Sequence, residues 1–125
     1  MIQKGSLLNV IDNSGAKRVS CIHIYNGYRK RYAKTGDLIK VSIKAVRAGT
    51  NIKIKKGDVV KAIVVECKSP LTFFSGSSKI IAQNSVVLIS NQNNFLGTRI
   101  FSFLDSSFKS SRYLRVLTLS NGVSY

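Results

Sequence analysis

Two stretches of this chain repeat one pattern, and that pattern restricts the possible folds more than any other feature of the sequence. "KTGDLIKVSIK" begins at Lys34 and "KKGDVVKAIVV" begins at Lys55, so each places Lys-x-Gly-Asp before a run rich in β-branched residues. Glycine tolerates the positive φ of a tight turn, and aspartate can accept hydrogen bonds from the local backbone. The pattern therefore predicts two consecutive units, each a tight turn followed by a β-strand.

The first of these runs alternates between apolar and polar residues. Its apolar positions are Ile39, Val41 and Ile43, and its polar positions are Lys40, Ser42 and Lys44. Because successive side chains of a strand point to opposite faces, we expect the apolar set to face a core and the lysines to face outward. Further strands are expected at Leu7–Val10, Lys17–Ile24, Ile80–Ala82 and Val86–Ser90, with a turn at Asp12–Gly15.

Short strands separated by regular turns favour a small, mainly β barrel over a solenoid, because two copies of a repeat are too few to stack. The length suits one domain, with the barrel over about residues 1–101 and an appendage over about 102–125. In that appendage Asp105 is a suitable N-cap for a short helix. The stretch "YLRVLTLS" fits either a helical turn or a strand.

The charge of the chain is extreme. Lys and Arg total 20 against 5 Asp and Glu, a formal net charge of +15. Such an excess destabilises the free compact state by self-repulsion and becomes favourable beside a polyanion, either nucleic acid or an anionic membrane. A soluble basic protein without a partner is the plain alternative. Membrane is disfavoured because apolar runs such as Ala62–Val65 are strand-sized, and the N-terminus reads as domain sequence rather than as a presequence.

The sequence offers little for catalysis. His23 is the only histidine, and the five acids, which are Asp12, Asp37, Asp58, Glu66 and Asp105, are scattered. Cys21 and His23 lie two apart on an expected strand and so should share a face, but no third group is evident to orient them. Cys21 and Cys67 form no metal motif and are expected to be buried and reduced. We therefore expect no enzyme activity, no cofactor and no metal.

Cations interleaved with tyrosines suit RNA, because Lys and Arg neutralise phosphates while aromatic rings stack on unpaired bases. The densest example is "NGYRKRYAKTGD", in which no acid precedes Asp37. The predicted RNA-binding residues are Lys17, Arg18, Arg29, Lys30, Arg31, Tyr32, Lys34, Lys40, Lys44, Lys53, Lys55 and Lys56. For any one of them a solvated surface charge is a sufficient explanation, but the clusters together favour binding.

Several stretches of the chain resemble one known family. "MIQKGSLLNVIDNSGAKRV", "RYAKTGDLIKVSIK", "KKGDVVKAIVV" and "LGTRIF" are similar, in this order, to the large-ribosomal-subunit protein L-fourteen family. The internal motif of the family reads here as Ala62–Val65, then Ser75-Gly76, Asn84 and Val87-Leu88. The resemblance implies a five-stranded barrel with a projecting hairpin and small C-terminal helices, and no catalysis.

The resemblance also implies partners. Proteins of this family bind large-subunit rRNA, touch neighbouring large-subunit proteins and contribute to the interface with small-subunit rRNA. A ribosome-silencing factor can dock on the same surface, and the matching residues here are Thr98, Arg99 and Arg115. A free-standing barrel that binds single-stranded nucleic acid is the alternative from another functional class.

Departures from the family pattern suggest further expectations. In "SPLTFFSGSS", expected to form a hairpin tip, Phe73 and Phe74 stand where the family usually has cations. An exposed Phe pair favours contact with another protein, and the alternative is a tip folded back on its own barrel. Ile81 replaces an aromatic residue, and "FSFL" replaces a turn containing Gly-Pro. Abundant Ile, Lys, Asn, Phe and Tyr favour a mitochondrial origin, with a plastid or the bacterial cytoplasm as alternatives.

Overall fold

The computed structural model describes residues 2–25, 27–49, 54–67, 70–72, 78–80, 83–105 and 115–124. Nearly all of its regular structure is β. The elements in chain order are β1 (Leu7–Val10), β2 (Ala16–Ile24), β3 (Leu38–Val46), β4 (Val59–Glu66), β5 (Pro70–Thr72), β6 (Ser78–Ile80), β7 (Ser85–Ile89), β8 (Ile100–Asp105), α1 (Arg115–Leu119) and β9 (Ser120–Ser124).

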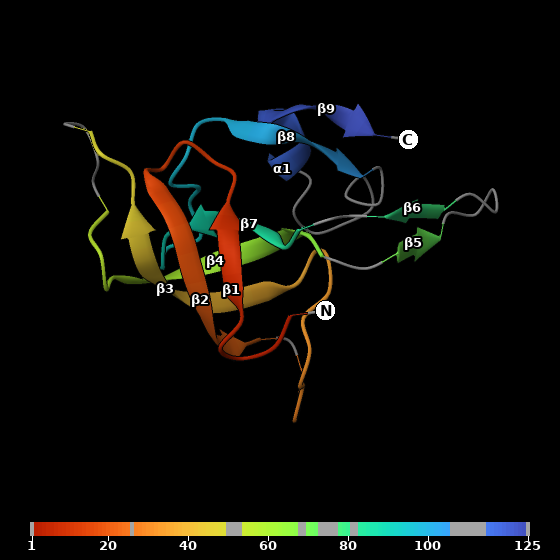
Figure 1. Cartoon of the computed structure of the whole chain (residues 1–125), viewed down its shortest axis with the longest axis horizontal. Coiled ribbons are helices and arrows are strands. Elements are labelled where there is room, and N and C mark those ends of the chain that lie inside the picture. The colour runs from red at the N-terminus through yellow and green to blue at the C-terminus, as the bar shows by residue number, and fades with distance from the viewer. Residues whose placement is uncertain are drawn as a thin grey trace.

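Five strands close into a barrel in the order β1-β2-β3-β4-β7 (Figure 1). The pairs are antiparallel except where β1 meets β7, which run parallel with Asn9 opposite Ser85. The prediction of a mainly β fold built on a small barrel is confirmed. The paired strands β5 and β6 project from one side of the barrel as a hairpin.

Both copies of the Lys-x-Gly-Asp pattern form the expected turns. The Asp37 carboxylate accepts a hydrogen bond from the Lys34 backbone N–H at 2.8 Å, and Asp58 accepts one from the Lys55 N–H at 2.9 Å. Gly36 has a backbone φ of 90°, a value that residues with a Cβ atom rarely adopt. These two aspartates therefore have a structural role that the repeat predicted.

The second half of β4, at Ala62–Val65, and the whole of β7 are buried on both faces. In β4, Ala62 and Val64 fill the barrel interior, while Ile63 and Val65 belong to a second apolar cluster outside it. β7 divides its side chains between the two cores in the same way. This explains why both strands read as continuous apolar runs rather than alternating ones.

The second cluster is covered by the C-terminal elements. Ile100 at the start of β8 and Val116 in α1 are both buried against it. β8 and β9 pair in parallel, so this appendage holds more strand than expected (Figure 1). "YLRVLTLS" contains both structures that its pattern allowed, since α1 leads directly into β9. Asp105 is the last residue of β8, and because residues 106–114 lie outside the described residues, its predicted role as a helix N-cap stays a prediction.

Irregular pairing in β2 overturns one expectation about its faces. Cys21 pairs with Val41 and His23 pairs with Lys40, so Ile22 is an extra residue in a β-bulge. Cys21 is consequently buried while His23 is exposed, although strict alternation would place them on one face. The prediction that these two side chains share a face is therefore wrong.

Candidate nucleic-acid interface

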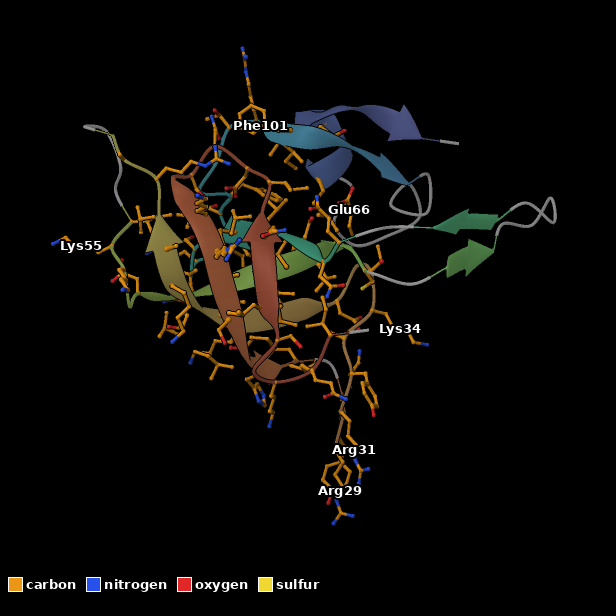
Figure 2. All side chains as sticks on the ribbon, in the orientation of Figure 1. Arg29, Arg31, Lys34, Lys55, Glu66 and Phe101 are labelled. Carbon is orange, nitrogen blue, oxygen red and sulfur yellow. The ribbon has the colours of Figure 1, made fainter. Side chains whose placement is uncertain are left out.

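The densest group of cations lies on the loop between β2 and β3. Arg29 and Arg31 project from the tip of this loop, away from the barrel (Figure 2). The Arg29 guanidinium carbon lies 5.3 Å from the centre of the Tyr28 ring, and 90% of the Tyr28 surface is exposed. Both the cationic groups and an aromatic ring are thus presented to solvent, as an RNA contact requires.

Within this loop, Lys30 differs from its neighbours. Its Nζ forms an ion pair of 2.7 Å with Oδ2 of Asp37, the same oxygen that accepts the Lys34 N–H. The pair is partly shielded, with side-chain exposures of 26% and 21%. Lys30 is therefore better placed to hold the loop against its closing turn than to meet a phosphate alone.

A second group of cations lies around the β3–β4 connection. Register brings its members together, because Ala16 pairs with Val46, and the Ile43 N–H donates to the carbonyl of Asp58 in the turn before β4. The exposed members are Lys17, Arg18, Lys44, Lys55 and Lys56. Figure 2 shows Lys55 well separated from Arg29, so the predicted residues form two clusters rather than one. Lys53 lies outside the described residues.

Between the two clusters, a row of polar side chains crosses the outer face of the barrel. Lys40 pairs with His23 on one side and with Lys61 on the other. The Lys61 Nζ lies 6.0 Å from the centre of the Tyr25 ring, which itself contacts His23 edge-on. Lys40 was predicted from the sequence, whereas Lys61 was missed.

A signal for Lys61 was present in the sequence. It stands three residues after Asp58, just as Lys40 stands three residues after Asp37. Two further exposed cations, Lys4 and Arg47, were also missed, and both lie outside the recognised pattern.

A latch between two loops fixes the segment that carries Thr98 and Arg99. The Asn13 Oδ1 accepts hydrogen bonds from the Thr98 N–H at 2.7 Å and the Arg99 N–H at 3.2 Å, and its Nδ2 donates to the Thr98 hydroxyl. A Cβ at Gly97 would lie 2.8 Å from that Oδ1, so only glycine fits. Thr98 and Arg99 are both exposed on the held segment.

The other predicted surface residues are less defined. Arg115 is the first residue of α1, but its side chain lies outside the described set, as do Phe73 and Phe74 entirely. Among the residues described, no helix is long and apolar enough to cross a bilayer, and no three His, Cys, Asp or Glu side chains gather as metal ligands.

Burial raises the pKa values of three groups, two cysteine thiols and one aspartate carboxyl. Burial raises the pKa of the Cys21 and Cys67 thiols above their ordinary value, which disfavours the nucleophilic thiolate. Burial also raises the pKa of Asp12, a carboxyl group with 1% exposure. Hydrogen bonds from Ser14 and from the Leu88 N–H oppose this shift. These groups are packed structural elements rather than parts of a reactive site.

A comparison with protein families identifies the family of the chain. The family model described as ribosomal protein L14p/L23e matches residues 1–124. Members of this family are structural proteins of the large ribosomal subunit, which associate with rRNA and other ribosomal proteins and are not enzymes. The resemblance noted in the sequence is thereby confirmed at the level of the family. The chain belongs to the ribosomal protein L14p/L23e family and is a structural constituent of the large ribosomal subunit.

Proposed function

We propose that this protein binds large-subunit rRNA through the loop cluster, the β3–β4 cluster and the polar row that joins them. The supporting observation is the continuity of this surface. Cations run from the exposed Arg29 and Arg31, across the half-buried Lys40 and Lys61, to the exposed Lys44 and Lys55 on adjoining strands and loops. Phosphate contacts release condensed counterions, so binding strengthens as salt falls.

The segment that Asn13 holds contributes to the subunit interface in this proposal. Thr98 and Arg99, together with Arg115 at the start of α1, meet small-subunit rRNA or a ribosome-silencing factor. Phe73 and Phe74 contact a neighbouring large-subunit protein. The abundance of Ile, Lys, Asn, Phe and Tyr, which is typical of AT-rich coding DNA, favours a mitochondrial ribosome, with plastid and bacterial ribosomes as the alternatives.

Sedimentation of a native lysate tests the assignment. The chain is expected to co-sediment stoichiometrically with large subunits and whole ribosomes in a sucrose gradient, as followed by mass spectrometry. Enrichment in mitochondrial ribosomes would support the compartment. A chain that stays at the top of the gradient would overturn the rRNA-binding role in this cell and favour a free-standing single-strand binder.

A test of the silencing-factor surface needs variants that keep the hydrogen bonds between Asn13 and the segment of Thr98 and Arg99. Arg99→Ala removes an exposed cation without touching the Asn13 side chain, because only the Arg99 backbone is bonded to it. We expect this variant to weaken silencing-factor binding to purified large subunits about 10-fold, as measured by co-sedimentation, from loss of one charge-assisted contact. Thr98→Ser retains the hydroxyl that Asn13 holds and is the matched control. Unchanged binding by Arg99→Ala would exclude Arg99 from the contact.

A further inference from the structure

An open hollow lies between the N-terminal turn and the loop cluster. It encloses about 330 Å³ and is lined by Gln3, Lys4, Lys30, Arg31 and Tyr32. That volume is at the lower end of the range of about 300–1,000 Å³ for small-ligand sites. The lining combines cations, one amide and one aromatic ring, so it suits a small anion that carries a flat polar group.

The two walls of the hollow are tied together by backbone hydrogen bonds. The Ile2 N–H donates to the Ala33 carbonyl at 3.0 Å, and the Ala33 N–H donates back to Ile2 at 2.7 Å. The Gly5 N–H donates to the Cys21 carbonyl at 2.7 Å, which fixes the N-terminal turn on β2. Walls held in this way need little reorganisation to bind a ligand.

The lining residues can contact two parts of a nucleotide, its base and its phosphate. Tyr32 exposes 43% of its surface beside the hollow, enough for a base to stack on its ring. Lys4 and Arg31 are exposed cations that can meet a phosphate, whereas Lys30 is already paired with Asp37 and stiffens the wall. Gln3 can both donate to and accept from a base edge.

The geometry points to a binding site for one unstacked nucleotide of RNA, with its base on Tyr32 and its phosphate between Lys4 and Arg31. This inference rests on the proposed rRNA binding and narrows it, because a paired helix presents phosphates to the cations but offers no free base to the Tyr32 ring. RNA with a bulged or looped-out base is recognised by stacking and edge contacts that duplex RNA cannot offer. The site therefore selects an unpaired nucleotide over a helix.

The test compares two RNAs with the full-length protein. One is a hairpin whose stem carries a single unpaired fluorescent adenine analogue, and the other is the same stem fully paired. Wild-type protein is expected to prefer the bulged RNA and to change the fluorescence of the analogue. Tyr32→Ala is expected to reduce affinity for the bulged RNA about 5- to 150-fold, the value of one base stack, and to leave duplex affinity unchanged.

Matched variants separate this site from general electrostatics. Tyr32→Phe keeps the ring and should retain the preference. Lys55→Ala should weaken both RNAs equally, whereas Lys4→Ala should weaken the bulged RNA more. If Tyr32→Ala keeps the wild-type preference, or if wild type shows none while still binding both RNAs, the nucleotide site is wrong and rRNA binding stands. If the wild-type protein binds neither RNA, both the nucleotide site and the proposed rRNA binding are wrong.

Discussion

Large subunits purified from cells that express only the double variant Arg29→Glu, Arg31→Glu should lack this protein. Both side chains project from the tip of the β2–β3 loop, away from the barrel (Figure 2). Losing two charge-assisted phosphate contacts should weaken rRNA binding by about 3–6 kcal/mol, and reversed charge adds repulsion. In a filter-binding titration against rRNA fragments, the slope of log K against log salt should fall in magnitude by about 2. Incorporation is measured by mass spectrometry of gradient-purified subunits.

The ion pair of Lys30 provides an internal control for this prediction. Lys30→Ala removes a cation from the same loop, but one whose charge Asp37 already balances. Its effect on the salt slope should be clearly smaller than that of Arg31→Ala. Equal slopes for the two variants would show that position in the loop, rather than free charge, decides binding. Normal incorporation of the double reversal would refute the role of the tip.

Replacing Asp12 with asparagine should lower the free energy of unfolding by about 2 kcal/mol, the cost of leaving a buried donor without an acceptor. The Asp12 Oδ2 accepts the Leu88 N–H at 3.0 Å, and its Oδ1 accepts from the Ser14 N–H at 3.1 Å and from the Ser14 hydroxyl. An amide turns one of these acceptors into a donor that faces another donor. Urea unfolding followed by circular dichroism measures the loss. Asp58→Asn, in an exposed turn, is the control and should lose less.

The same pair of proteins tests the titration of Asp12. Because burial raises its pKa, the folded state binds this proton more tightly than the unfolded state does. The contribution of Asp12 to stability is therefore fully present below the ordinary value of 3.8 and declines as pH rises through the higher folded pKa. The stability of wild type relative to Asp12→Asn should thus be greatest in acid and decrease across that window. A difference that grows with pH would contradict the desolvation argument.

Local chemistry in the sequence predicted the barrel well, because each signal is decided within a few residues. The Lys-x-Gly-Asp turns and the alternation of β3 depend on neighbouring positions alone, and both are confirmed. The second core could not be predicted, since it needs Ile100 and Val116 to reach Ile63 from distant parts of the chain. β8 was missed for the same reason.

The candidate site shows the same division. The exposure of Lys44 on β3 followed from alternation. The bulge at Ile22 depends on how β2 meets β3, so it separated His23 from the face of Cys21. The neutralisation of Lys30 by Asp37 likewise depends on the path of the loop between them. The hollow beside Tyr32 requires Ile2 to pair with Ala33, a contact that no local pattern announces.

The pairing of β4 with β7 and the two-sided burial of both strands have a consequence for the nascent chain during synthesis. The last barrel strand follows the end of β4 by roughly 20 residues, an interval of about 1–4 s at translation rates of about 5–20 residues per second. During that interval β4 has been synthesised, but the edge that pairs with β7 is unpaired and the outer apolar face is uncovered. The β5–β6 excursion therefore lengthens the period in which the nascent chain is most prone to aggregate.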